Sequence, residues 1–193
     1  MSTLHIKQTQ NSTLLDVINE IEPTLAQGQL ITDILLNKKP LKPNWHQNPE
    51  KILVLEGDSL EISIESSTTL AKQALLLSKE TIIDILVDFK KIADSFKQQQ
   101  DSDANTMFIQ GIDNLQNFLK IIEEATHLLG RPLDKIKDGN ILFIQHISNL
   151  SNILEKIIAI QNAKDWDLLS EMIENEMLPA IKNISRIYGI LEI

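Results

Sequence analysis

The sequence has no cysteine and few aromatic residues, and these absences exclude several classes of protein. Without Cys, the 193-residue chain cannot form a disulfide framework, a cysteine zinc site, an iron–sulfur cluster or a cysteine nucleophile. Its 27 acidic residues outnumber its 18 basic ones, which gives a net charge of -9. Nucleic-acid binding depends on clustered Lys and Arg. We therefore expect no nucleic acid as a partner.

Long apolar runs and glycine-rich motifs are also missing. Apolar runs such as Ile141–Ile144 are four residues long, whereas a membrane span needs about 20. Met1–Lys7 lacks the pattern of a signal peptide, so we expect a cytoplasmic protein that contacts no membrane. The glycines are isolated, and neither a phosphate-binding loop nor a serine-hydrolase elbow occurs. We therefore expect no cofactor and no enzymatic activity.

A change of pattern near Ser66 divides the chain in two. Apolar residues make up 42% of the sequence, enough for a sizeable core. Residues 1–66 contain four of the six prolines and short alternating stretches, whereas residues 67–193 show the period of a helix. The pattern predicts a mainly α protein, in which a small α+β unit at 1–66 precedes a helical bundle at 67–193.

The first part is predicted to contain short strands and one short helix. Leu4 and Ile6 alternate with polar residues, and residues 30–36 form a second strand candidate. Ser12 is the expected N-cap of a helix that ends near Pro23. Residues 52–64, with Gly57-Asp58 at the centre, give the clearest hairpin signal in the chain.

The second part predicts about four long amphipathic helices joined by short turns, hence an up-down bundle. The third helix is expected to start near Ile136, although Asp138-Gly139 can break its first turns. Asp165 is the expected cap of the fourth helix, in which Pro179 predicts a kink or a break. The predicted buried face of the first helix comprises Leu70, Ala74, Leu77, Ile82, Ile85, Phe89, Ile92 and Phe96.

Three segments of this second part carry a resemblance. Residues 163–169 read Ala-Lys-Asp-Trp-Asp-Leu-Leu, residues 173–179 read Ile-Glu-Asn-Glu-Met-Leu-Pro, and residues 108–115 read Phe-Ile-Gln-Gly-Ile-Asp-Asn-Leu. In these segments the C-terminal half resembles a family of uncharacterised bacterial helical-bundle proteins. The resemblance implies a helical fold and brings no activity with it.

His127 and His146 are the two histidines that could serve in a metal site or in phosphotransfer. Glu124 and His127 form an E-x-x-H pair, which places a carboxylate and an imidazole on one helix face. A di-iron bundle needs two such pairs, and Phe143 stands where the carboxylate preceding His146 would be. A His-centred metal-binding or phosphotransfer protein therefore stays an alternative. We expect His146 to be partly buried and satisfied by a neighbouring helix.

Trp45 and His46 lie in a Pro-rich loop of the first part. Trp is enriched at interface hot spots, so these two residues are the predicted partner-binding site, unless Trp45 covers the small core instead. The outer faces of the helices are expected to be a solvated polar surface. We thus expect a non-catalytic protein–protein interaction protein, an adaptor or a chaperone-like bundle. A chaperone for a secreted or flagellar subunit is the alternative function. The sequence leaves open whether the protein forms a homo-oligomer.

Overall fold

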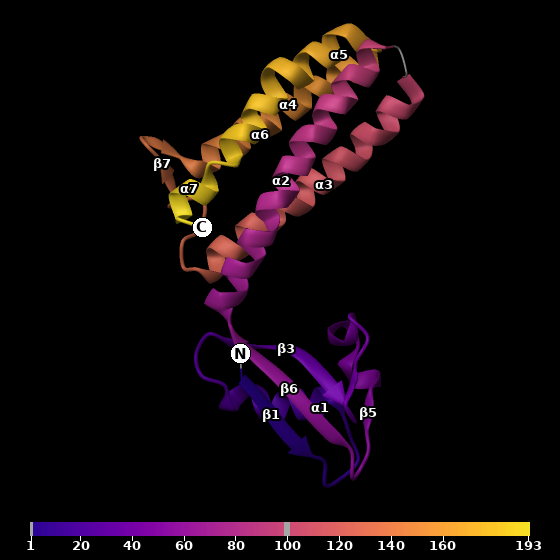
Figure 1. Cartoon of the computed structure of the whole chain (residues 1–193), viewed down its shortest axis with the longest axis vertical. Coiled ribbons are helices and arrows are strands. Elements are labelled where there is room, and N and C mark those ends of the chain that lie inside the picture. The colour runs from indigo at the N-terminus through magenta and orange to yellow at the C-terminus, as the bar shows by residue number, and fades with distance from the viewer. Residues whose placement is uncertain (1, 99–100) are drawn as a thin grey trace. The chain divides into compact units, whose positions relative to one another are not determined.

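The computed structural model describes residues 2–98 and 101–193, in which the chain forms two compact units that divide between Leu70 and Ala71 (Figure 1). The first unit is rich in strands, and the second consists almost entirely of helices. The predicted fold class, mainly α with a small α+β unit before a helical bundle, is confirmed.

An antiparallel sheet covered by one helix forms the first unit. The strands pair in the order β1-β6-β3-β4, and β2 pairs separately with β5. Leu60, Ile62 and Ile64 alternate along β6 with half-exposed residues and pack against α1 residues in one small core. The elements are β1 Ser2–Lys7, β2 Ser12–Thr13, α1 Leu14–Ile21, η1 Glu22–Thr24, β3 Gln29–Leu36, β4 Lys39–Pro40, η2 Trp45–Gln47, η3 Pro49–Lys51, β5 Leu53–Val54 and β6 Ser59–Ser66.

The predicted hairpin over residues 52–64 is wrong. β5 pairs with β2, whereas β6 lies between β1 and β3 as the central strand of the larger sheet. The turn at Gly57-Asp58 does form, with the Asp58 N–H donating to the Leu55 carbonyl at 3.0 Å. The turn residues thus gave a correct local signal, but the pairing of the strands on either side is set by partners far along the chain.

The N-cap of α1 is Thr13 and not the predicted Ser12. The Asp16 N–H donates to the Thr13 hydroxyl at 3.3 Å, and the Thr13 N–H donates back to the Asp16 carboxylate at 2.9 Å. This reciprocal capping box satisfies two amide groups at the start of the helix. Ser12 is instead part of β2.

Four helical rods form a bundle in the second unit, and each rod runs antiparallel to the next (Figure 1). The first three rods are α2, α3 and α4, and the last rod consists of α5, η4 and α6. Gly111 of α3 lies against Phe89 and Ile92 of α2, and Gln161 of α4 donates to Asn105 of α3 at 2.6 Å. The last rod packs against α4 and α2. The elements are α2 Ser67–Lys97, α3 Asp101–Leu128, β7 Lys137–Asp138, β8 Ile141–Leu142, α4 Phe143–Ala163, α5 Trp166–Met172, the π-helix η4 Ile173–Met177, α6 Leu178–Ile184 and α7 Ile187–Leu191.

The bundle core follows a heptad pattern, because buried positions on α2 and α3 alternate in steps of four and three residues. Part of the predicted face of α2 is therefore displaced by one residue. Leu77 is 73% exposed, and Ala71, Leu75 and Ser78 are buried in place of Leu70, Ala74 and Leu77. On α3 this pattern comprises Ala104, Phe108, Gly111, Leu115, Phe118, Ile122 and Ala125, and Thr126 is buried beside it.

The third and fourth helices differ from the prediction at their starts and interruptions. Ile136 lies outside α4, because β7 and β8 form a hairpin through Gly139 and α4 begins only at Phe143. Asp165 caps α5 as predicted, with its carboxylate accepting from the Leu168 N–H at 3.1 Å. Pro179 does not break the last rod, since α6 runs through it. No helix in the described part of the chain is long and apolar enough to cross a membrane.

Candidate functional site

Glu124 and His127 lie together at the C-terminal end of α3, on the rim of a surface pocket of about 500 Å³. Both side chains are exposed, and Glu124 pairs with Lys120 at 3.7 Å. Within residues 2–98 and 101–193, no group of three His, Asp or Glu side chains is placed to hold a metal ion. A closed metal site needs about four ligands, so the pair has the geometry of a polar helix end.

Trp45 is half-buried, whereas the neighbouring His46 is exposed. The indole packs against the core of the first unit and makes an edge contact with the His46 ring, with 5.9 Å between centroids. Two surface hollows of about 480 and 410 Å³ border Trp45. The residue therefore covers the small core while its edge stays accessible, and its role in partner binding stays a prediction.

His146 is partly buried as expected, but its partner lies on the hairpin and not on a neighbouring helix. Its Nε2 atom lies 3.1 Å from the Asp138 carboxylate, whose other oxygen accepts from Arg186 at 2.9 Å. Asp138 is only 9% exposed. This buried carboxylate thus ties β7, α4 and the turn before α7 together, which is a structural role.

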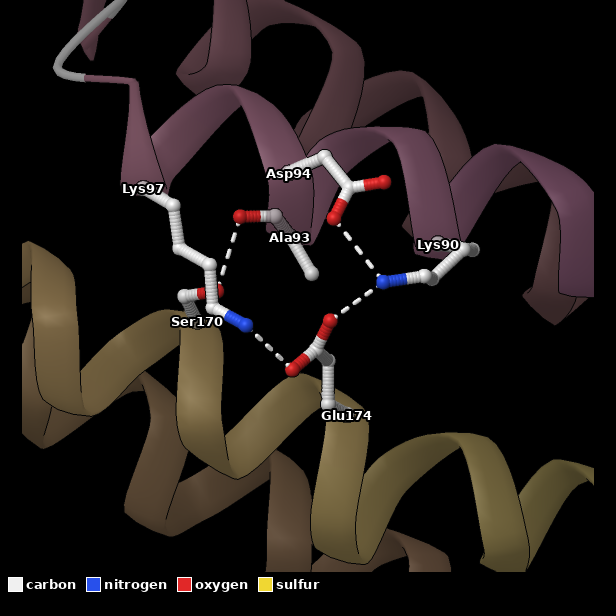
Figure 2. Close-up of polar contacts among 6 residues, drawn as sticks. All are labelled: Lys90, Ala93, Asp94, Lys97, Ser170 and Glu174. Atoms are coloured by element: carbon white, nitrogen blue, oxygen red, sulfur yellow. Dashed lines mark hydrogen bonds and ion pairs between the residues drawn. The ribbon is translucent and has the colours of Figure 1, made fainter.

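A second charged cluster joins the last rod to α2 (Figure 2). This cluster, which we call the clamp, consists of Glu174, Lys90, Lys97 and Asp94. The Glu174 carboxylate accepts from Lys90 and Lys97, each at 2.5 Å, and Lys90 also reaches Asp94 at 2.8 Å. The two lysine ammonium groups lower the pKa of Glu174 below its ordinary value. Glu174 therefore stays ionised and paired at neutral pH.

The clamp coincides with a π-helical turn. The Leu178 N–H donates to the Ile173 carbonyl five residues earlier, and Pro179 follows directly. A proline ring clashes with the carbonyl four residues before it in a regular helix, and the wider turn gives the ring room. One turn earlier, the buried Ser170 hydroxyl donates to the Ala93 carbonyl of α2 at 2.7 Å (Figure 2). These contacts fix the register between the last rod and α2.

Tyr188 is a buried side chain whose hydroxyl could in principle take part in general acid–base chemistry. Its hydroxyl lies 2.9 Å from the Ser78 hydroxyl, which also faces the Leu75 carbonyl. Burial raises the pKa of Tyr188 to about 12. The phenol is therefore protonated at neutral pH and joins α7 to α2 through a neutral hydrogen bond.

An open apolar groove runs between α3 and α4, with a volume of about 270 Å³. Its floor includes the buried Phe108, and its two walls carry Ile109 and Ile158, whose exposed fractions are 61% and 55%. The groove is lined by Phe108, Ile109, Ile112, Asp113, Gln116, Leu154, Ile158 and Gln161.

The helix exteriors are mainly polar, as expected, but exposed aliphatic side chains interrupt them in this region and along α2. Leu77, Ile83 and Val87 are 73%, 57% and 47% exposed on α2. The sequence contained a signal for these positions, because Ile109 and Ile158 each stand directly beside a core residue and cannot share its helix face.

A family model described as "Domain of unknown function (DUF8042)" matches residues 75–187, more than half of the chain. The chain belongs to this family. The resemblance of the C-terminal half to a family without a known activity is thereby confirmed, since the segments at 108–115 and 163–179 lie inside the DUF8042 match. No curated protein and no solved structure matches the chain. The α3–α4 groove lies within the matched residues, whereas Trp45 and His46 lie before them.

Proposed function

We propose that the chain is a non-catalytic, cytoplasmic protein–protein interaction protein, an adaptor or a chaperone-like bundle, that binds its partner through the DUF8042 helices. The observation that supports this proposal is the α3–α4 groove, where aliphatic side chains on two adjacent helices stay accessible to solvent. Scattered apolar residues on a surface are ordinary, whereas these aliphatic side chains line one hollow between two helices.

Binding at the groove has a clear driving force. Burying a large aliphatic side chain stabilises a complex by about 1.5–3 kcal/mol. Ile109 of α3 and Ile158 of α4 both line the groove and are each more than half exposed. A partner that covers both side chains gains somewhat more than half of this free energy at each of them, before the costs of association. The half-buried Trp45 offers less new contact area.

Affinity capture from the native host tests the proposal. The full chain and the variants Ile109→Asp/Ile158→Asp and Trp45→Ala serve as baits, with mass spectrometry of the retained proteins. Any partner is then purified and its affinity measured with each bait. We expect a partner that binds the wild type and is lost with the groove variant. A partner lost only with Trp45→Ala places the interface on the first unit, and the absence of any direct partner contradicts the proposal.

The metal-binding alternative is separated by elemental analysis. Glu123 and Asp134 line the same pocket as Glu124 and His127, but no three His, Asp or Glu side chains of the described residues are placed to hold a metal ion. We expect protein purified from metal-supplemented medium to carry no stoichiometric iron, manganese or zinc. One metal ion per chain that disappears with His127→Ala would instead favour the His-centred alternative.

A further inference from the structure

We propose that the α3–α4 groove binds one amphipathic helix of a partner protein, and that this helix carries Lys or Arg beside its aliphatic stripe. The inference rests on the proposed function and deepens it, because it names the secondary structure and the charge of the bound segment. Three features of the groove support it: its length, its walls and its single charge.

The length of the groove fits two turns of helix. On α3 the lining residues run from Phe108 to Gln116, which corresponds to about 12 Å at a rise of 1.5 Å per residue. A helix that places aliphatic side chains at i, i+3 or i+4, and i+7 spans about 10.5 Å. Gln161 and Asn105 close one end of the site with their 2.6 Å hydrogen bond.

The two walls supply aliphatic surface on both sides of such a helix. Ile109 rises from α3 and Ile158 from α4, and both are more than half exposed. Between them, Ile112 and Leu154 are half-buried members of the bundle core. An amphipathic helix that lies along the groove therefore places aliphatic side chains of its lower face in contact with these residues.

The charge of the site selects a cationic partner. Asp113 is the one ionised side chain among the lining residues. The α3 positions three and four residues away are Ile109, Gln110, Gln116 and Asn117, so no cation on its own helix compensates it. Within the part of the chain that the structure describes, no ion pair involves Asp113. The net charge of -9 further favours the approach of a basic segment.

Selection from a peptide library tests the inference without a known partner. The probe is a phage-displayed library of 16-residue helix-forming peptides, which is panned on the full chain. We expect enriched peptides with aliphatic residues at i, i+3 or i+4, and i+7, flanked by Lys or Arg. One enriched peptide is then labelled for fluorescence anisotropy. Ile109→Asp and Ile158→Asp are each expected to weaken its binding about tenfold or more.

A charge exchange and a matched control make the test specific to the groove. Asp113→Lys is expected to reverse the preference, so that the panned peptides carry Glu or Asp in place of Lys or Arg. Leu77→Asp, which changes a 73% exposed side chain on α2 outside the groove, is expected to leave the affinity unchanged. Circular dichroism melts confirm that each variant keeps its fold.

Several outcomes would overturn the inference. These are the absence of an enriched peptide, enrichment without a basic residue, or equal affinity for the wild type and both groove variants. A wild-type dimer that Ile158→Asp converts to a monomer would show that a second copy occupies the groove. A native partner captured equally by the wild type and the groove variant overturns this inference but leaves the proposed function standing. The absence of both an enriched peptide and a native partner contradicts the two together.

Discussion

The contacts that stabilise each unit differ in how far apart their residues lie in the sequence. In the first unit, β1 pairs with β6, so that residues 2–7 lie beside residues 59–64. In the second unit, buried residues recur every three or four positions along each helix and pack against the neighbouring helices of the bundle. Helical periodicity can be recognised within one segment, whereas strand pairing depends on segments that are far apart. The comparison therefore predicts that the units have separate cores and unfold separately.

Each unit contains one tryptophan, so the unfolding of each unit can be measured separately. Trp45 packs against the core of the first unit. Trp166 stacks on Phe96 in the second, with 5.5 Å between the ring centroids. In Trp45→Phe and Trp166→Phe backgrounds, the fluorescence of the remaining indole follows the unfolding of a single unit.

The largest effect is expected from Phe118→Ala. Phe118 is fully buried in the bundle, and such a truncation costs about 3–5 kcal/mol through lost burial and a residual cavity. In urea titrations, the transition reported by Trp166 should shift strongly, while the transition reported by Trp45 stays in place.

The reciprocal control is Ile62→Ala, which truncates a fully buried side chain on the central strand β6. It should shift the Trp45 transition by about 2–5 kcal/mol and leave the Trp166 transition unchanged. If either substitution moved both transitions equally, the units would share one cooperative core.

A smaller effect is expected from Gly111→Ala, at the close approach of α3 to α2. An added Cβ would lie 3.1 Å from Phe89 Cζ and 3.2 Å from Ile92 Cδ1, and both side chains are buried. The cost of overpacking is about 1–3 kcal/mol, against about 1 kcal/mol gained in helix propensity. We expect a net loss of bundle stability of about 1 kcal/mol, measured by the Trp166 transition.

Gly189→Ala is the matched control for this packing argument. Gly189 lies in α7, and an added Cβ would meet no atom within 4 Å. Only the propensity gain applies, so bundle stability should rise by up to about 1 kcal/mol. Equal signs for the two alanine substitutions would show that the contact between Gly111 and Phe89 is not close.

A smaller effect again is expected from the clamp in Figure 2. Glu174→Gln removes the carboxylate that pairs with Lys90 and Lys97, at a cost of up to about 1 kcal/mol. The pKa of Glu174 is lowered in the folded state, so its contribution is present above the ordinary value of 4.5 and is lost as the pH falls through the lowered pKa. Urea titrations at several pH values should show the wild type and the variant converging in acid.

Glu176→Gln offers a comparison within the same π-helical segment. Glu176 makes a single exposed ion pair with Lys156 at 3.2 Å. Its removal should cost less than the removal of Glu174, because an isolated surface pair contributes about 0–1 kcal/mol. A larger loss with Glu176→Gln would contradict the assignment of Glu174 as the clamp.

The fold was predictable from the sequence wherever its signal is local. The helices of the bundle and the cap at Asp165 follow from apolar periodicity and from residue type. The hairpin over residues 52–64 was wrong, because β6 has better partners in β1 and β3 than in the segment before it. Leu77 was placed in the core, because a shift of one residue along a helix still gives a plausible apolar face.

The candidate groove was not predicted, although its residues lie in helices that were. A groove depends on which faces of α3 and α4 meet, and that arrangement is set by packing between distant segments. Asp138 was missed as the partner of His146 for the same reason, since it lies on a hairpin where a helix had been expected. Trp45 was predicted as a partner-binding residue from its residue type alone, and its side chain packs partly against the small core.

The proposed binding site lies entirely within residues 67–193, so it requires that these residues form a self-contained bundle. Expression of residues 67–193 and a thermal melt followed by circular dichroism at 222 nm provide the test. We predict a strongly helical spectrum and a single cooperative transition. A non-cooperative melt, or a loss of helical signal without residues 1–66, would show that the first unit completes the core and would contradict the account.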